Sequence, residues 1–280
     1  MKVAVMTDST AYISEDVRKE MGIHMIPLSV VFGNTSYREE IDISTEEFYE
    51  KMRKEKELPT TSQPSIGHIV DKLEELKKDY DAVISVHLSS EISGTYQAVV
   101  SAGEMVEGID VYPYDSEASC FVQAFYCFEA VKLSKENKTP EEIIARLDEM
   151  KQTMRAYFMV DDLTNLVRGG RLSNAQGLVG SLLKIKPILH FVDKKIVPFE
   201  KIRTRKKALN RIMGMLEEEA AKGKNLKVGF IHGNDETSAI ELEKEFKEKY
   251  PHIDTSIFYF GPVIGTHLGE GALGVGWYEK

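Results

Sequence analysis

Short apolar runs alternate with longer amphipathic segments over the first half of the chain. Runs rich in β-branched residues predict strands, and segments with helical spacing predict helices. Strands are expected at residues 3–6, 25–32, 82–88 and 109–114. Helices are expected at residues 15–21, 45–55, 65–78, 96–105, 119–136 and 140–151. This alternation predicts an α/β fold with a mostly parallel sheet and flanking helices.

Three of these helices begin with a capping signal. Ser14 precedes the first helix, and its side chain can accept a hydrogen bond from a free backbone amide. Ser44 and Thr139 each stand three residues before a glutamate, which is the spacing of a capping box. Pro140 suits the first position of the helix that follows Thr139.

The pattern changes from Ala156 onward, where hairpin and crossover connections mix. Strands are expected at 157–160, 188–191, 196–199, 226–231 and 256–260, and helices at 173–183, 205–221 and 236–249. The strands on either side of residues 193–195 should form a hairpin. We therefore expect two domains, an α/β domain over residues 1–158 and a C-terminal α+β domain over residues 159–280.

Polar turns follow several of the expected strands. Residues 8–10, 89–95 and 115–116 would share one edge of the parallel sheet, and ligands of open α/β sheets bind at that edge. The first amides of the helix after Ser93 lack partners, and the helix dipole places partial positive charge there. Hydroxyls of Thr61 and Ser93 could add hydrogen-bond donors. The sequence thus predicts a site for a small negative group.

Composition narrows the function class. The 280 residues are 42% hydrophobic and 29% charged, which is typical of a soluble globular protein with one large domain or two. A net charge of −9 argues against nucleic-acid binding. No apolar stretch is long enough to span a bilayer and no signal peptide is visible, so we expect a cytoplasmic protein without stable membrane insertion.

The two cysteines, Cys120 and Cys127, fall on one expected helix. Two helical turns separate them by about 10 Å, which is too far for a disulfide. We expect both to be buried free thiols in a reducing compartment.

Common cofactor and catalytic motifs do not occur in the sequence. There is no Gly-x4-Gly-Lys-Ser/Thr phosphate loop, no dinucleotide glycine pattern after an expected strand, and no Gly-x-Ser-x-Gly elbow. His-Glu-x-x-His and paired Cys-x-x-Cys motifs are missing as well. We expect no nucleotide site, no cofactor and no metal.

Three further segments carry candidate chemistry, and each has a structural alternative. Residues 261–267 end in His267, which could donate to a carboxylate or phosphate, act as a base, or be satisfied within a loop. Arg168 and Arg171 flank two glycines and could clamp an anion or end a helix in solvent. The basic run at residues 201–207 could dock an acidic partner or form a solvated face.

Taken together, these motifs resemble the DegV family, which includes the fatty-acid-binding subunits of bacterial fatty acid kinase. The matching segments are residues 8–10, 60–65, 93–95, 168–172, 184–189, 203–209 and 265–267. Each is weak alone, and seven in order over nearly the whole chain are specific. The resemblance implies a two-domain fold with the ligand between the domains.

The resemblance also implies residue roles. Thr61, Ser93 and His267 would hold the carboxylate of a long-chain fatty acid, with Ser62, Gly94 and Thr95 beside them, and an apolar tunnel would hold the acyl chain. The chain would be a lipid-binding subunit rather than an enzyme, without catalytic residues of its own. A separate ATP-dependent kinase subunit would convert the carboxylate to an acyl-phosphate for phospholipid synthesis. The arginines that could contact that partner or neutralise phosphate are Arg168, Arg171, Arg203 and Arg205.

The chain departs from the family pattern in two places. Phe121 and Gln123 stand where the family often has glycines, and they could reshape the tunnel. Glu270 stands where proline is common, and a second negative charge there would weaken carboxylate binding unless its side chain points outward.

Two other functions compete with lipid binding. A serine hydrolase would use Ser93 as nucleophile, His267 as base, and Asp8 or Asp115 to orient the histidine. A subunit of a dihydroxyacetone-type kinase would bind a small carbonyl compound at His267 and would need a small polar cavity.

Overall fold

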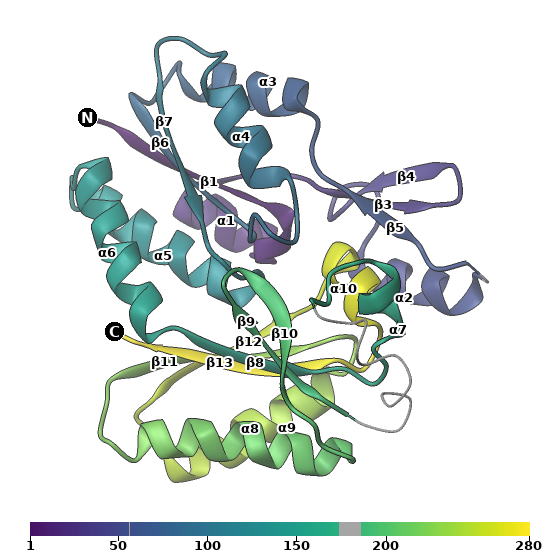
Figure 1. The fold of residues 1–280 in the computed structure, drawn as a ribbon. Coiled ribbons are helices and arrows are strands. Elements are labelled where there is room, and N and C mark those ends of the chain that lie inside the picture. The colour runs from purple at the N-terminus through teal and green to yellow at the C-terminus, as the bar shows by residue number, and fades with distance from the viewer. Residues whose placement is uncertain (56, 174–185) are drawn as a thin grey trace.

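The computed structural model describes residues 1–55, 57–173 and 186–280. Among these residues the strands form three sheets, and two of them are stacked with helices between them (Figure 1). The mixed α/β fold with a parallel first sheet and a second, mixed sheet is confirmed. The helix expected at 173–183 and the start of the motif at 184–189 fall mostly outside the described residues.

The first sheet is parallel throughout. Its order is β2 (Ile23–Ile26), β1 (Val3–Asp8), β6 (Ala82–His87) and β7 (Asp110–Asp115). All residues of β1 and β6 are buried, because helices cover both faces. On one face α3 (Ile66–Leu76) and α4 (Thr95–Gly103) pack through an aliphatic cluster that includes Leu73 and Val99. α1 (Glu15–Met21) packs beside β2.

The strand expected at 25–32 is wrong as a single element. Pro27 follows the end of β2, and because proline has no backbone amide it cannot continue the ladder. The chain then enters β3 (Ser29–Phe32), which pairs antiparallel with β4 (Thr35–Arg38) and with β5 (Thr60–Ser62) in a separate small sheet. Residues 60–62, to which the sequence pattern assigned no element, therefore form a strand. α2 (Thr45–Lys54) packs beside this sheet.

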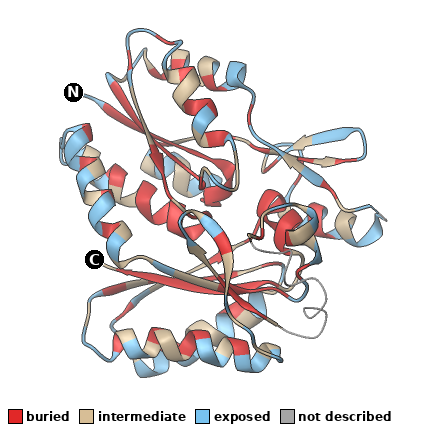
Figure 2. Cartoon of the chain, in the orientation of Figure 1, coloured by how far each residue is buried: buried red, intermediate tan, exposed pale blue. Residues whose placement is uncertain are grey.

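Two helices fill the space between the two large sheets. α5 (Phe121–Lys135) lies against β1 and β6 on one side and β11 on the other, and α6 (Pro140–Thr153) contacts β13. Figure 2 shows that the face of α5 between the sheets is buried, whereas the outer faces of the bottom helices are exposed. Both cysteines are free and buried here, as expected.

The second large sheet is mixed. Its order is β10 (Lys195–Glu200), β9 (Ile188–Val192), β8 (Arg155–Met159), β13 (Leu273–Glu279), β11 (Leu226–His232) and β12 (Asp254–Tyr259). The expected hairpin is confirmed as β9 and β10. Asp193 and Lys194 both have positive φ at its turn, as a type I′ hairpin requires. α8 (Arg205–Ala220) and α9 (Glu236–Lys249) cover the outer face.

The glycine-rich tail is the main element that the sequence pattern missed. Part of it forms β13, in the middle of the sheet, because its glycines accept close neighbours. A Cβ on Gly276 would lie 2.5 Å from the ring of Phe121, and one on Gly229 opposite would lie 2.8 Å from it. The aromatic side chain that departs from the family pattern thus fills the space above a pair of glycines.

Short helices complete the fold on the side of the small sheet. α7 (Thr164–Arg168) and α10 (Pro262–Leu268) contact each other, and α10 also contacts α2, β3 and β5 (Figure 1). The segment ending in His267 is therefore helical, with Pro262 in its first turn. A short 3-10 helix, η1 (Ser9–Ala11), follows β1.

The helix caps at Ser14, Ser44 and Thr139 are present, the last two as complete capping boxes. β8 begins at Arg155 and already belongs to the second large sheet, so the change of sheet falls near the boundary expected between residues 158 and 159. The division into two independently folding domains stays a prediction, and limited proteolysis between α6 and β8 would test it.

Candidate functional site

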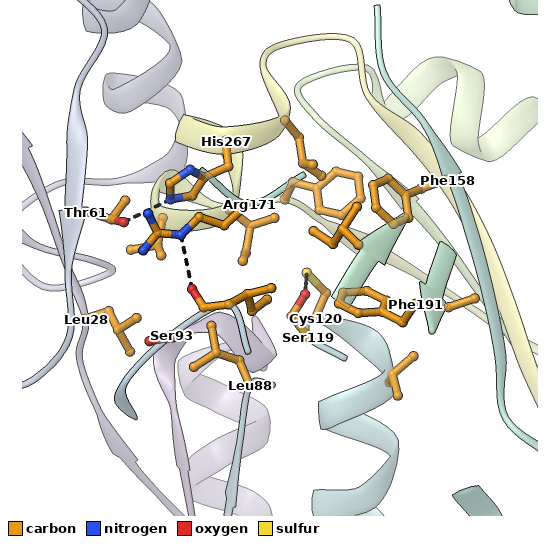
Figure 3. Close-up of a pocket in the computed structure, with 18 of the residues that line it drawn as sticks. Leu28, Thr61, Leu88, Ser93, Ser119, Cys120, Phe158, Arg171, Phe191 and His267 are labelled. Atoms are coloured by element: carbon orange, nitrogen blue, oxygen red, sulfur yellow. Dashed lines mark hydrogen bonds between the residues drawn. The ribbon is translucent and has the colours of Figure 1, made fainter. Parts of the chain in front are cut away.

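A cavity of about 310 Å³ lies beside the second large sheet, whose strands line one wall, and its other walls come from β5, α10, the start of α5 and the segment after β6. One end carries polar groups, and the other is lined by apolar side chains (Figure 3). The apolar walls include Leu88, Phe158, Phe191, Ile231 and Val263, which come from five separate segments of the chain. A cavity with this division suits a ligand that is largely hydrocarbon with one polar end.

Thr61 and His267 meet at the polar end of the cavity. The hydroxyl oxygen of Thr61 lies 2.9 Å from Nε2 of His267 (Figure 3). Thr61 is placed by the pairing of β5 with Val30 of β3, and His267 by the last turn of α10. Two residues that the sequence singled out independently are therefore hydrogen-bonded neighbours.

His267 is almost completely buried. Burial, with the Arg171 guanidinium nearby, lowers the pKa of its imidazole to about 4. The ring is therefore neutral near pH 7 and carries a single N–H. Its Nδ1 is buried without a hydrogen-bond partner in the described part of the chain, and a Cβ on Gly169 would lie 2.3 Å from it. Because Gly169 has no side chain, the imidazole can occupy this space.

Ser93 and Gly94 line the same polar end, and Thr95 lies buried behind them. The Ser93 hydroxyl is 2.9 Å from that of Thr95 and accepts a 3.3 Å hydrogen bond from the Thr95 amide. Ser62 lines the cavity at its exposed rim. Gln63 is a neighbour that sequence reasoning did not assign to the site: a Cβ on Gly94 would lie 2.1 Å from its Oε1.

The four candidate arginines lie in different places. Arg171 lines the cavity, and its guanidinium donates to the carbonyls of Ile92, at 3.1 Å, and Gly169. Arg168 is exposed and lines an adjoining hollow of about 230 Å³ that also reaches Thr61 and His267. Arg203 is exposed and Arg205 is bonded to other parts of the chain, and neither lines the cavity.

Arg205 is held by groups next to the ends of strands of the second large sheet. Its guanidinium bonds to the carboxylates of Asp161 and Asp235 and, at 2.6 Å, to the carbonyl of Gly271. A partner that used Arg205 would have to compete with these bonds, whereas the side chain of Arg203 is exposed to solvent.

The residues of the hydrolase alternative are not assembled as a triad. His267 pairs with Thr61 rather than Ser93, and no carboxylate of the described residues bonds to its Nδ1. Asp115 accepts from Ser90 and pairs with Lys194. Asp8 lies 2.9 Å from Nδ1 of a different histidine, His87. The geometry that serine nucleophiles require is therefore not formed at Ser93.

Asp8 and His87 do form a Ser–His–Asp arrangement with Ser85, whose hydroxyl lies 2.5 Å from Nε2 of His87. All three side chains are fully buried in β1 and β6, and none lines either of the two cavities that reach Thr61 and His267. The arrangement ties the two central strands together.

The two remaining departures from the family pattern, Gln123 and Glu270, do not line the cavity. Gln123 is fully buried and bonds to Thr7 at 2.9 Å and Thr10 at 3.0 Å, which fixes the end of β1. Glu270 bonds to Asn234 and forms an ion pair with Arg53, and it does not line the cavity. In the described segments, no helix combines the length and apolar character needed to cross a membrane.

Known proteins resemble this chain over its whole length. The family model described as "Uncharacterised protein, DegV family" matches residues 2–280. Protein DegV of Bacillus subtilis is 58% identical over 281 residues, with 100% of both chains covered. The crystal structure of DegV, a fatty acid binding protein from Bacillus subtilis, matches with a TM-score of 0.95 at 58% identity and full coverage of both chains. A fatty acid binding DegV family protein from Thermus thermophilus matches with a TM-score of 0.92 at 29% identity, again over 100% of both chains.

Proposed function

The chain belongs to the DegV family, and on that premise we propose that it binds a long-chain fatty acid in the cavity that ends at Thr61 and His267. The observation that carries this proposal is the pairing of an apolar cavity with uncharged hydrogen-bond donors at one end. The relatives from Bacillus subtilis and Thermus thermophilus, both fatty acid binding proteins, support the same ligand class here.

The energetics favour a long chain over a short one. Each buried methylene contributes about 0.8 kcal/mol, so a dozen or more contribute on the order of 10 kcal/mol before association costs. A buried carboxylate without partners loses several kcal/mol. Hydrogen bonds at the polar end offset that loss, so the head group is the part of the ligand that needs precise placement.

The polar end can satisfy a carboxylate with neutral donors and one cation. When His267 donates its Nε2 proton to Thr61 Oγ1, the Thr61 hydroxyl proton is free to donate to the ligand. The Ser93 hydroxyl can donate to the other carboxylate oxygen, and Arg171 supplies positive charge at the same wall. Ser62, Gly94 and Thr95 shape this end around the head group.

We further propose that the bound carboxylate is presented to a separate ATP-dependent kinase subunit. A carboxylate oxygen would attack the γ-phosphorus of ATP held by that subunit, giving an acyl-phosphate for phospholipid synthesis and releasing ADP. Ser62 and Gly94 are exposed at the polar rim, and the adjoining hollow with Arg168 opens the same end to solvent. We place this reaction in the cytoplasm, where ATP and reduced thiols occur together.

Lipid binding is tested by native mass spectrometry of protein purified from cells, followed by extraction and lipid analysis. We expect a bound long-chain acid in near-stoichiometric amount. A small carbonyl compound in its place would support the dihydroxyacetone-type alternative, which the apolar walls formed by Phe158, Phe191 and Ile231 disfavour. An empty site that also rejects added palmitate would overturn the proposal.

The kinase step is tested by charge reversal at the exposed arginines. Arg168→Glu and Arg203→Glu should lower kinase-dependent acyl-phosphate formation at least tenfold while palmitate affinity stays within about twofold. Lys244→Glu, on the exposed side of α9, is the matched control. Unchanged turnover in both arginine variants would remove these arginines from the partner contact. Arg205→Glu is unsuitable, because it would break the bonds to Asp161 and Asp235.

A further inference from the structure

The carboxyl group of Glu39 is buried behind the polar end of the cavity, and it does not line that cavity. Its Oε1 accepts hydrogen bonds from the Tyr12 hydroxyl at 2.8 Å and from the Val263 amide at 2.7 Å. Its Oε2 accepts from the Ser9 hydroxyl at 2.6 Å. The Tyr12 hydroxyl in turn accepts from the Ile264 amide at 3.0 Å.

These bonds replace the N-terminal cap that α10 lacks. The first amides of a helix have no partner within it, and the N-cap residue of α10 is a glycine without a side chain. Glu39 and Tyr12, both from the first domain, satisfy the amides of Val263 and Ile264. His267 stands one helical turn after Val263, on the same side of the helix.

Glycines bring α10 close enough for this arrangement. A Cβ on Gly261 would lie 2.2 Å from the Tyr12 ring, and a Cβ on Gly265 would lie 2.7 Å from the Tyr49 hydroxyl. The Tyr49 hydroxyl also donates to the carbonyl of Phe260 at 2.8 Å. α10 therefore packs closely against Tyr12 and Tyr49 of the first domain. A side chain larger than that of glycine at position 261 or 265 would push the helix away from these two tyrosines.

The same carboxyl group is linked to the strand that carries Thr61. Ser9 accepts a 3.0 Å hydrogen bond from the Leu28 amide, and the Glu39 amide donates to the Leu28 carbonyl at 2.9 Å. β3 begins at the next residue, and its Val30 pairs with Thr61. Both members of the Thr61–His267 pair are thus held by elements that meet at Glu39.

The geometry points to Glu39 as a positioning residue for the head-group site: it fixes α10 against β3 so that His267 and Thr61 meet at the ligand carboxylate. This inference rests on the proposed function for its ligand, but the geometry of the Thr61–His267 pair can be measured without any lipid. Glu39 acts through α10 and never touches the fatty acid.

The test compares Glu39→Ala with Glu39→Gln. In Glu39→Gln the amide oxygen can still accept from Tyr12 and Val263 while its NH₂ donates to Ser9, so this variant should behave like the parent protein. Affinities are measured for palmitate and for hexadecanol, which has the same chain without the carboxylate. Glu39→Ala should bind palmitate about tenfold more weakly and hexadecanol within about twofold of the parent.

A general loss of structure would lower the affinities for palmitate and hexadecanol together. The ratio of the two affinities therefore reports only how well Thr61 and His267 are positioned for the carboxylate. Glu142→Ala, which removes the capping-box carboxylate of α6, is the control for stability alone and should leave the ratio unchanged. In the ligand-free protein, NMR of the His267 ring should show its pKa rising from about 4 toward 6.5 in Glu39→Ala, as the imidazole leaves its buried place.

An unchanged palmitate-to-hexadecanol ratio together with an unchanged His267 resonance in Glu39→Ala overturns the inference. If Glu39→Ala does not fold, Tyr12→Phe, which removes the link to Ile264, is judged by the same two measurements and the same criterion. Failure of the parent protein to bind palmitate would overturn the proposed function instead, and the NMR result would still decide the role of Glu39.

Discussion

The Thr61 hydroxyl lies 2.9 Å from Nε2 of His267, although 206 positions separate the two residues in the chain. Thr61 belongs to a three-residue strand, β5, and His267 to a seven-residue helix, α10. Their contact closes the polar end of a cavity whose walls come from the second large sheet and from segments of both halves of the chain. The proposed head-group site therefore depends on the way the two halves of the chain pack.

Removing the Thr61 hydroxyl should weaken the grip on the carboxylate without changing the shape of the cavity. Thr61→Val should lower palmitate affinity by about 1–3 kcal/mol, because one ligand hydrogen bond is lost and the buried Nε2 of His267 loses its partner. The measurement is a palmitate titration by calorimetry. Thr35→Val, on an exposed position of β4, is the matched control and should bind like the parent. Parent-like affinity in Thr61→Val would remove Thr61 from the site.

The neutral state of His267 has a consequence for stability at low pH. Its pKa is about 4 in the folded protein and 6.5 when unperturbed, so the unfolded chain binds the proton first as the pH falls. The stabilisation is complete above pH 6.5 and is lost as the pH falls toward 4, with a total of about 3 kcal/mol. His267→Asn should lose less stability than the parent between pH 6.5 and 4 in urea unfolding. Parallel curves for the two proteins would contradict the buried neutral ring.

Glu39 should act in the opposite pH direction. Burial raises the pKa of its carboxyl to about 8, although Ser9, Val263 and Tyr12 donate to it. An acid whose pKa is raised in the folded state stabilises fully below its ordinary value of 4.5, and that contribution is lost as the pH rises through about 8. The groups that face it include Glu40, which adds to the rise, and Tyr12.

Glu39→Gln should therefore flatten the decline of unfolding free energy between pH 5 and 8 that the parent shows. This decline is measured by unfolding the parent and the variant in urea at several pH values. A decline of the same size in the variant would assign the titration to another group.

The packing of Phe121 on two glycines predicts a specific pattern of rescue. Gly229→Ala should destabilise the protein by about 1–3 kcal/mol, because the new methyl group overlaps the Phe121 ring. Phe121→Ala alone leaves a void and should cost about 3–5 kcal/mol. In the double variant the two changes should cost less than their sum, because the methyl group enters the space that the ring leaves.

Gly276→Ala is the contrasting case. Its Cβ would lie 2.6 Å from the carbonyl of Arg155 as well as 2.5 Å from Phe121, and a backbone atom cannot be removed by mutation. Phe121→Ala should therefore rescue Gly276→Ala less than it rescues Gly229→Ala. Equal rescue at the two positions, measured by thermal or urea unfolding, would show that the ring is not the deciding contact.

Much of the fold could be predicted from the pattern of the sequence. The helices at 15–21 and 236–249 have the expected bounds, because a capping residue, Ser14 or Asp235, precedes each of them and apolar spacing marks their length. The expected strand at 25–32 failed because continuous apolar character hides the break that Pro27 imposes. β13 was missed because glycine is uncommon in strands. Gly274 and Gly276 occur there because Phe158 and Phe121 pack against them, and these contacts between distant segments cannot be read from the sequence pattern.

Some residues of the candidate site could likewise be predicted from the sequence, and others could not. Thr61, Ser93 and His267 were singled out by local motifs, and the fold brings them to one cavity. Arg171 was expected at a partner contact and lies in the cavity wall, whereas Arg205 is bonded to Asp161, Asp235 and Gly271. Glu39 carries no motif at all, since its importance arises only from three donors that come from distant segments.

The most direct test of the central claim is a crystal structure of the protein with palmitate. We expect one carboxylate oxygen within hydrogen-bond distance of the Thr61 hydroxyl, and the acyl chain between Phe158 and Phe191. A palmitate bound elsewhere, or one whose carboxylate points away from Thr61 and His267, would contradict the account.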